Sequence, residues 1–193
     1  MKIKIISMLL TLSALAAACQ SAPSMHGTTF ESAAAVEDFT LHTSAADVSL
    51  SQFRGKYVIL FFGFTHCEDV CPVTLATLRE ALSTLGTDAE RFQVIFISVD
   101  YPRDTPQVAS EYAQQFNPRF IGASGSKEEI DAAASRFGVS YEFLPADSEG
   151  NYEVEHSASV FVLDSNSRLT LTWPYGLTSQ ELAQDMKNLL KRK

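Results

Sequence analysis

Blocks of hydrophobic and polar residues follow one another along this chain in an order that predicts alternating strands and helices. Residues 57–64 (YVILFFGF) and 92–99 (FQVIFISV) are almost continuously apolar, as strands covered on both faces of a sheet are. Between them, leucines recur at helical spacing over residues 75–85, and Pro72 stands at the expected first residue of that helix. This part of the sequence therefore predicts a strand, a helix and a second buried strand.

Three more helices are predicted by the residues that begin them. Thr105-Pro106 precedes a run of apolar residues at helical spacing. Ser126 with Glu129, and Thr178 with Glu181, have the capping-box spacing that opens a helix. We therefore expect one helix directly after the second buried strand and two in the C-terminal half.

The remaining extended segments predict two hairpins. Residues 140–143 and 151–155 form short arms around a turn, and residues 159–163 and 168–173 flank Asp164-Ser165-Asn166. The order of elements is that of an α/β domain with a thioredoxin-like fold, in which helices flank a mixed central sheet. Insertions at the N-terminal side and in the middle of the chain are expected to decorate this fold.

The first 18 residues have the pattern of a signal peptide. Lys2 and Lys4 form a positive start, and the apolar stretch that follows is too short to cross a membrane. Residues 15–19 (LAAAC) resemble a bacterial lipobox, whose cysteine is acylated and becomes the new N-terminus, but Ala16 occupies the position where leucine is usual. We expect Cys19 to carry lipid; plain secretion with a free Cys19 is the alternative.

Residues 20–36 are small and polar without periodicity, which is typical of a flexible tether. The lipidated cysteine and tether would thus occupy residues 19–36, ahead of a thioredoxin-like domain over residues 37–193. This organisation predicts a lipoprotein of the bacterial cell envelope, anchored in a membrane and facing the periplasm, where disulfides are allowed to form. The formal net charge of −8 argues against a nucleic-acid partner.

The most informative motif is Cys67-Glu68-Asp69-Val70-Cys71, because it follows a buried strand and precedes a helix. At that junction unpaired backbone N–H groups and the helix dipole lower the pKa of a thiol, whereas Glu68 and Asp69 raise it and favour a bound cation. Such a pair can act as a redox-active dithiol or as metal ligands. A purely structural disulfide between Cys67 and Cys71 is a further alternative, although so short a loop contributes little stability.

The spacing of the two cysteines favours a metal site over thioredoxin-type redox catalysis. Thioredoxin-class catalysts have two residues between the cysteines, whereas this motif has three, and the wider turn can direct both sulfurs to one ion. His156 precedes the strand predicted over residues 159–163, and in a thioredoxin-like fold the loop before that strand faces the cysteine turn. Two thiolates and an imidazole form a soft ligand set suited to copper, as Cu(I) or Cu(II), whereas structural zinc takes four ligands.

Other polar residues are weaker candidates. His66 directly precedes the cysteine motif and ranks well behind His156 as a ligand, and neither His26 nor His42 has a convincing metal-binding partner. Asp100 ends the second buried strand, at the edge where α/β sheets place function, and is a candidate to orient the ligands. A role for Asp100 as a cap or turn residue is equally compatible with its position.

Three separated stretches of the sequence resemble the SCO/SenC family. They occur in the expected order, as FFGFTHCEDVCP at 61–72, SVDYPRDTP at 98–106 and YEVEHSASVFVLD at 152–164. The resemblance extends over about residues 37–190 and implies a thioredoxin fold, membrane attachment and a role as a copper-binding assembly factor for respiratory cytochrome c oxidases. The copper ligands that it implies match Cys67, Cys71 and His156 position by position.

Two departures from the family pattern are visible. Glu68 stands where proline is common after the first cysteine, and Tyr101 separates Asp100 from the proline that usually follows it directly. Neither departure removes a ligand. Glu68 in place of proline affects the rigidity of the turn and the pKa of the thiols. It therefore affects the balance between copper binding and thiol exchange.

The sequence thus favours a metallochaperone over an enzyme. In this hypothesis the reduced dithiol captures copper and passes it to the copper subunit of an oxidase, at its CuA site, or to another envelope copper protein. The alternative is a thiol–disulfide oxidoreductase that uses Cys67 and Cys71 as a redox-active pair to keep the oxidase's copper-ligand cysteines reduced. A peroxiredoxin-type peroxidase is a weaker third candidate, because the threonine-rich turn before a single reactive cysteine is missing.

Overall fold

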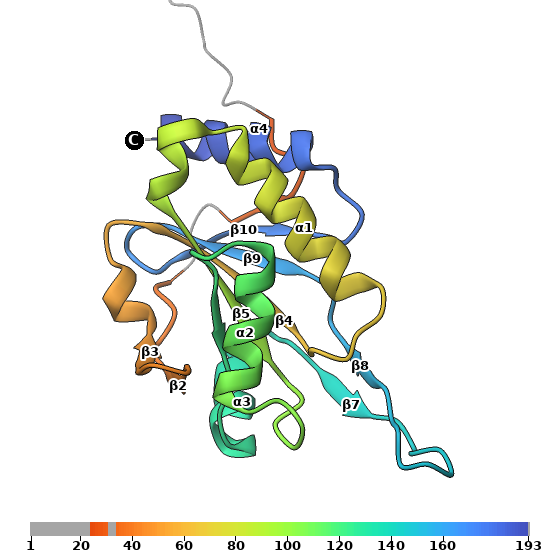
Figure 1. Cartoon of the computed structure of the whole chain (residues 1–193). Coiled ribbons are helices and arrows are strands. Elements are labelled where there is room, and N and C mark those ends of the chain that lie inside the picture. The colour runs from red at the N-terminus through yellow and green to blue at the C-terminus, as the bar shows by residue number, and fades with distance from the viewer. Residues whose placement is uncertain (1–23, 31–33, 193) are drawn as a thin grey trace, which may run out of the picture.

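A six-stranded mixed sheet forms the centre of the computed structural model, which describes residues 24–30 and 34–192 (Figure 1). The strand order is β1-β10-β9-β4-β5-β6. β4 (Tyr57–Gly63), β5 (Phe92–Ser98) and β6 (Ile121–Ala123) run parallel to one another. The other strands pair antiparallel; they are β1 (Thr28–Thr29), β9 (Val160–Leu163) and β10 (Leu169–Trp173).

Helices cover both faces of this sheet, which confirms the fold class predicted from the sequence. In the described part of the chain they are α1 (Val70–Ser83), α2 (Pro106–Phe116), α3 (Lys127–Ser135) and α4 (Ser179–Lys191). α1 packs against α2 and α4, while α2 also packs against β5 and β6 (Figure 1). Phe137, which directly follows the C-terminal cap of α3, packs on the opposite face against Phe62 and Phe161.

The helices begin where their capping residues predict. The Thr105 side chain accepts a hydrogen bond from the N–H of Val108, and both predicted capping boxes, at Ser126 and Thr178, are formed. α1 begins two residues before Pro72, which was expected to be its first residue. Proline is tolerated at the third helical position because the N–H groups of the first turn have no partner within the helix.

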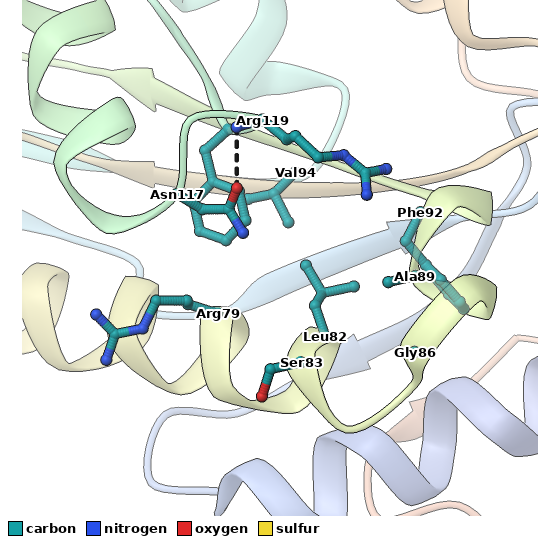
Figure 2. A pocket seen from close by; sticks show the side chains of 10 residues that line it. Arg79, Leu82, Ser83, Gly86, Ala89, Phe92, Val94, Asn117 and Arg119 are labelled. Carbon is teal, nitrogen blue, oxygen red and sulfur yellow. Dashed lines mark hydrogen bonds between the residues drawn. The ribbon is translucent and has the colours of Figure 1, made fainter.

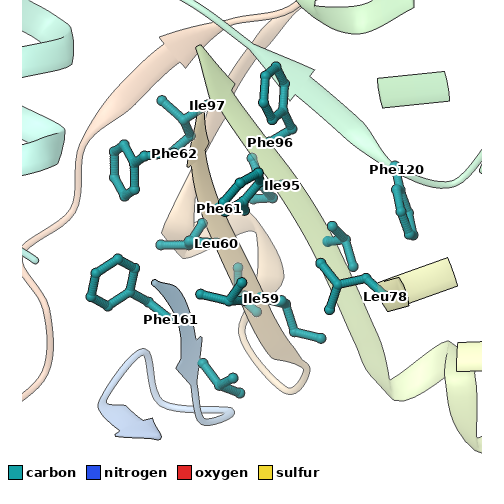
Figure 3. Packing of buried hydrophobic residues seen from close by; sticks show 14 of the residues in the cluster. Ile59, Leu60, Phe61, Phe62, Leu78, Ile95, Phe96, Ile97, Phe120 and Phe161 are labelled. Atoms are coloured by element: carbon teal, nitrogen blue, oxygen red, sulfur yellow. The ribbon is translucent and has the colours of Figure 1, made fainter. Parts of the chain in front are cut away.

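Alternate side chains of β4 enter two separate halves of the hydrophobic core (Figure 3). Phe61 packs against Phe96 of β5, which in turn contacts Tyr112 of α2. Phe62 points the other way, where it meets Phe161 of β9. This double burial is the reason why β4 reads as a continuous apolar run.

β1 joins the sheet within the segment expected to be a tether. Thr28 and Thr29 pair with β10, and the backbone N–H groups of His26 and Gly27 donate to the buried carboxylate of Asp185 on α4, at 2.9–3.1 Å. Two threonines among small polar residues carry no period that would predict a strand. The proposed leader over residues 1–18 and Cys19 lie outside the described residues.

Smaller elements surround the sheet. They are the hairpin strands β2 (Thr40–His42) and β3 (Asp47–Ser49), the 3₁₀ turns η1 (Leu50–Phe53) and η2 (Gly86–Arg91), and the arm strands β7 (Tyr141–Phe143) and β8 (Val154–His156). The sequence predicted the arm, but not β6, whose three residues are too few to show a period. No helix in the described part of the chain has the length and apolar character needed to span a membrane.

Candidate metal centre

The chain brings the predicted ligands together through the pairing of two neighbouring strands. β4 ends at Gly63 and leads through a short turn into α1, so that Cys67 lies in the turn and Cys71 in the first helical turn. β9 pairs antiparallel with β4, and β8 ends at His156 shortly before β9 begins. This pairing brings the cysteines, which follow β4, close to His156, which precedes β9, at the carboxyl end of β4.

Cys67, Cys71 and His156 offer ligand atoms that all lie within 4.8 Å of one another. The Nε2 atom of His156 is 3.6 Å from the Sγ of Cys71. The backbone N–H of Cys71 donates to the Sγ of Cys67 at 3.4 Å, and both cysteines are free thiols. Cys71 is fully buried and Cys67 is partly exposed, so the group opens to solvent on the Cys67 side.

The imidazole of His156 is held in a defined orientation. Its Nδ1 lies 3.1 Å from the carbonyl oxygen of Ser157, which can only accept, so Nδ1 carries the proton and the Nε2 lone pair faces the sulfur. Phe61 and Phe64 flank the ring in edge-to-face contacts, with centroid distances of 6.2 and 5.8 Å. The histidine side chain is therefore fixed in the tautomer that a metal ligand needs.

Gly63 leaves the space that the Cys71 sulfur occupies. A Cβ at this position would lie 2.6 Å from the Sγ of Cys71 and 2.9 Å from the Cε2 of Phe96. Contacts this short are far inside ordinary van der Waals separation. The last residue of β4 must therefore lack a side chain for the sulfur to sit against the sheet.

The two thiols have very different affinities for protons. Hydrogen bonding from Cys71 lowers the pKa of Cys67 to about 5, although partial burial acts in the opposite direction. Hydrogen bonding to Cys67, together with burial, raises the pKa of Cys71 far above its ordinary value. Near neutral pH the pair therefore holds one proton and one negative charge, with the charge on Cys67.

Asp100 connects the end of β5 with the arm that carries His156. Its buried carboxylate accepts hydrogen bonds from the Tyr152 hydroxyl at 2.8 Å and from the Nε of Arg103 at 2.6 Å. Arg103 also donates to the Tyr152 carbonyl at 3.0 Å and lies over its ring. The backbone carbonyl of Asp100 accepts the N–H groups of Arg103 and Asp104, which is the turn role considered from the sequence, while its role in orienting the ligands stays a prediction.

Asp104 is the polar residue of this region that sequence reasoning missed. Its carboxylate is fully buried and accepts hydrogen bonds from Thr65, at the start of the cysteine turn, and from Ser98 at the end of β5. A single aspartate before a Thr-Pro helix start resembles a turn residue, and its distant partner could not be identified from spacing. Asp104 lies within the family motif SVDYPRDTP, between Asp100 and the Thr105-Pro106 helix start.

His66, Asp100 and Asp104 form a second group whose ligand atoms lie within 4.8 Å. This group is poorly suited to a metal, because both carboxylates already accept short hydrogen bonds and Asp100 is paired with the Arg103 guanidinium. His66 is exposed, its Nδ1 lies 3.7 Å from Asp104, and it does not belong to the group formed by Cys67, Cys71 and His156.

The two remaining histidines lie in other parts of the fold. His42 contacts Asp47 and Glu129, and His26 lies 3.7 Å from Glu181 on α4. Neither belongs to a group of ligand atoms in the described part of the chain.

A cavity of about 220 Å³ lies between the C-terminal half of α1, the start of β5 and the loop before β6, and neither cysteine lines it (Figure 2). Its floor is apolar, formed in part by Leu82, Phe92 and Val94. Arg79 and Arg119 stand at its rim, but Figure 2 shows that their guanidinium groups point apart. They do not form a clamp for one anion, so the thiol group remains the candidate site.

Comparison with known proteins gives consistent matches. Residues 27–191 match the SCO1/SenC family. The solution structure of apo Sco1 from Thermus thermophilus is 42% identical with a TM-score of 0.79, and the match covers 86% of this chain and 97% of that one. The crystal structure of Arabidopsis thaliana ScoI with copper bound is 30% identical with a TM-score of 0.76, covering 82% and 100% of the two chains.

A curated relative extends the match to mitochondrial proteins. The SCO2 homologue of Mus musculus is 32% identical over 139 residues, which cover 71% of this chain and 54% of the mouse protein. The chain thus spans about half the length of this relative.

Proposed function

Because the chain belongs to the SCO1/SenC family, we propose that it binds one copper ion through Cys67, Cys71 and His156 and delivers it to a partner. The partner would be the copper subunit of a respiratory cytochrome c oxidase, at its CuA site, or another copper protein of the envelope. The observation that carries the proposal is the convergence of two sulfurs and one imidazole nitrogen within 4.8 Å. The copper-bound ScoI structure supports it.

The ligand atoms suit copper as cargo. Thiolate and imidazole are soft or borderline donors, and three of them satisfy copper but leave structural zinc one ligand short. Two thiolates leave Cu(I) with one excess negative charge and neutralise Cu(II), so one ligand set can hold either oxidation state. The orientation of Nε2 towards Cys71 means that the histidine need not change tautomer to bind.

Metal capture displaces a proton. Cys67 already carries a negative charge near neutral pH, whereas the strongly raised pKa of Cys71 means that copper must compete with the proton on that sulfur. Oxidation to a disulfide removes two electrons and the remaining thiol proton and leaves no thiolate to bind. Copper affinity is therefore expected to weaken as pH falls and to collapse on oxidation.

Transfer to a partner would begin at Cys67. Cys71 is fully buried and the imidazole is packed between two phenylalanines, so Cys67 offers the approach from solvent. An incoming ligand would replace its sulfur first, and Cys71 and His156 would follow. Stepwise exchange of this kind never leaves the ion without ligands.

A copper titration of the reduced protein tests the proposal. His156→Ala is expected to weaken binding about 100-fold, which corresponds to about 2.7 kcal/mol. His66→Ala is the matched control, because His66 lies beside the cysteine turn but faces Asp104. Equal affinities of wild type and His156→Ala would contradict a three-ligand site.

The unequal thiols favour a second candidate function, that of a thiol–disulfide reductase. The Cys67 thiolate would attack one sulfur of a partner disulfide, forming a mixed disulfide and releasing the other sulfur as a thiolate. Cys71, once deprotonated, would then displace the second partner sulfur, leaving the partner reduced and this chain with a Cys67–Cys71 disulfide. Rapid reduction of a disulfide substrate that is unchanged in His156→Ala would favour this function over copper delivery.

The location is a proposal of its own. We infer that residues 1–18 are a leader and that lipid on Cys19 anchors the protein in the bacterial envelope. Two observations support this inference. Residues 15–19 (LAAAC) resemble a lipobox, and if Cys19 carries lipid, the two other cysteines of the chain, Cys67 and Cys71, remain as a pair. Mass spectrometry of the mature N-terminus tests it, and a Cys19→Ser variant that stayed in the membrane fraction would contradict it.

A further inference from the structure

Asp104 places a fully buried carboxylate behind the cysteine turn. It lies between β5 and α2, where its own backbone N–H closes a turn onto the Asp100 carbonyl at 2.8 Å. Its Oδ2 accepts from the Thr65 N–H at 2.8 Å and from the Ser98 hydroxyl at 2.5 Å. Its Oδ1 accepts from the Thr65 hydroxyl at 2.6 Å.

No lysine or arginine pairs with this carboxylate among the described residues, in contrast to Asp100, which has Arg103. Burying a carboxylate without such a partner is costly unless hydrogen bonds replace its hydration. Three short, charge-assisted hydrogen bonds supply that replacement here. The structure thus holds a negative charge at a place where a neutral side chain would be easier to bury.

These hydrogen bonds fix the entrance to the cysteine turn. Thr65 is two residues before Cys67, and both of its polar hydrogens are committed to Asp104. The turn continues directly, with the N–H of Cys67 donating to the Phe64 carbonyl at 3.4 Å. The C-terminal end of the turn is held by α1. Asp104 holds the N-terminal end through Thr65.

We propose that Asp104 is a positioning residue of the copper site, which holds the Thr65–Cys67 backbone in place and keeps a fixed negative charge behind the cysteine turn. This inference rests on the proposed copper function. The charge favours Cu(II) over Cu(I), because it stabilises the more positive ion by more. The fixed backbone keeps the sulfur of Cys67 aimed at the site occupied by Cys71 and His156.

The test compares Asp104→Asn with wild type in the full reduced protein. We expect the affinity for Cu(II) to fall about tenfold relative to that for Cu(I), which raises the midpoint potential by about 59 mV for one electron. The Cu(II) absorption and electron paramagnetic resonance spectra are expected to change as well. Thr65→Val removes one of the three hydrogen bonds but keeps the charge, so it should alter the Cu(II) spectrum with a smaller change in potential.

Asp185→Asn is the matched control. Asp185 is also fully buried, has no cationic partner in the described part of the chain, and accepts three N–H donors, the third being the Trp173 indole at 2.9 Å. Both asparagine variants are expected to lose stability, but Asp185→Asn should leave the copper spectrum and potential unchanged. A purely structural role for Asp104 predicts that the two variants behave alike, and that result would overturn the proposal.

The outcomes also separate this inference from the proposed function. If wild type binds copper through His156 while Asp104→Asn and Thr65→Val match its spectrum and potential, only the role of Asp104 fails. If Asp104→Asn does not fold, Thr65→Val alone decides, because an unchanged Cu(II) spectrum in that variant refutes the positioning role. Wild-type protein that binds no copper refutes the proposed function itself.

Discussion

Gly63→Ala is expected to push the Cys71 sulfur out of its place. The added Cβ would start 2.6 Å from this sulfur and 2.9 Å from a ring carbon of Phe96. Ordinary contact begins near 3.5 Å, so one of the neighbours must retreat by about 1 Å. Cys71 lies in the first turn of α1 and Phe96 in a fully buried ring cluster, so neither can move without disturbing its packing.

Overpacking of this kind typically costs about 1–3 kcal/mol. We expect Gly63→Ala to lower the free energy of unfolding by about 2 kcal/mol in the reduced, metal-free protein, measured by urea denaturation. Copper affinity should fall as well, because the Sγ of Cys71 would leave its position 3.6 Å from the histidine nitrogen.

A double-mutant cycle measures how much of the loss in unfolding free energy comes from the clash with the Cys71 sulfur. In a Cys71→Ala background the Cβ at position 63 no longer meets the sulfur but still meets ring carbons of Phe96 and Phe61, so Gly63→Ala should cost about 1 kcal/mol less there. Equal costs in both backgrounds would show that the clash with the sulfur is not what requires glycine. A cost below about 0.5 kcal/mol in wild type would refute the steric argument altogether.

Three further predictions follow from the polar contacts. Iodoacetamide should alkylate Cys67 before Cys71 in the reduced, metal-free protein, with a rate that rises around pH 5 and is level by pH 7; a rise near pH 8.5 would contradict the lowered pKa of Cys67. Hydrogen bonds to two carboxylates raise the pKa of His42, so its contribution to stability should be full below about pH 6.5 and disappear as pH rises through the raised value. Urea denaturation of wild type and His42→Gln at pH 5.5 and 8.5 should therefore differ more at the lower pH, by less than about 1 kcal/mol because the group is partly exposed. Tyr152→Phe removes the hydroxyl that anchors the His156 arm to a buried carboxylate and should cost about 1 kcal/mol and weaken copper binding, whereas unchanged copper affinity would assign that hydrogen bond to stability alone.

The main elements of the fold could be predicted because their signals are local. The apolar runs of β4 and β5 and the capping boxes of α3 and α4 each specify an element within a few residues. β1 and β6 could not be predicted, because strands of two or three residues take their stability from a neighbouring strand and carry little pattern of their own.

The candidate site likewise contains residues that the sequence predicts and one that it does not. The two cysteines are visible as a pair, and His156 could be placed opposite them only through the topology of the fold and the family resemblance. Asp104 could not be assigned, because its bonding partner Thr65 is 39 residues away and no periodicity links them. Asp100 and Asp104 differ in that Asp100 has the Arg103 guanidinium beside it, a pairing that becomes visible only in the folded structure.

The antiparallel pairing of β9 with β4 has a consequence for the order in which the protein matures. Both cysteines belong to the first half of the chain, but His156 reaches them only after β9 has been synthesised and aligned with Phe61 and its neighbours. A growing or unfolded chain therefore offers a bare dithiol, with no imidazole to complete the set. Tight binding of copper through all three proposed ligands therefore requires the completely folded domain.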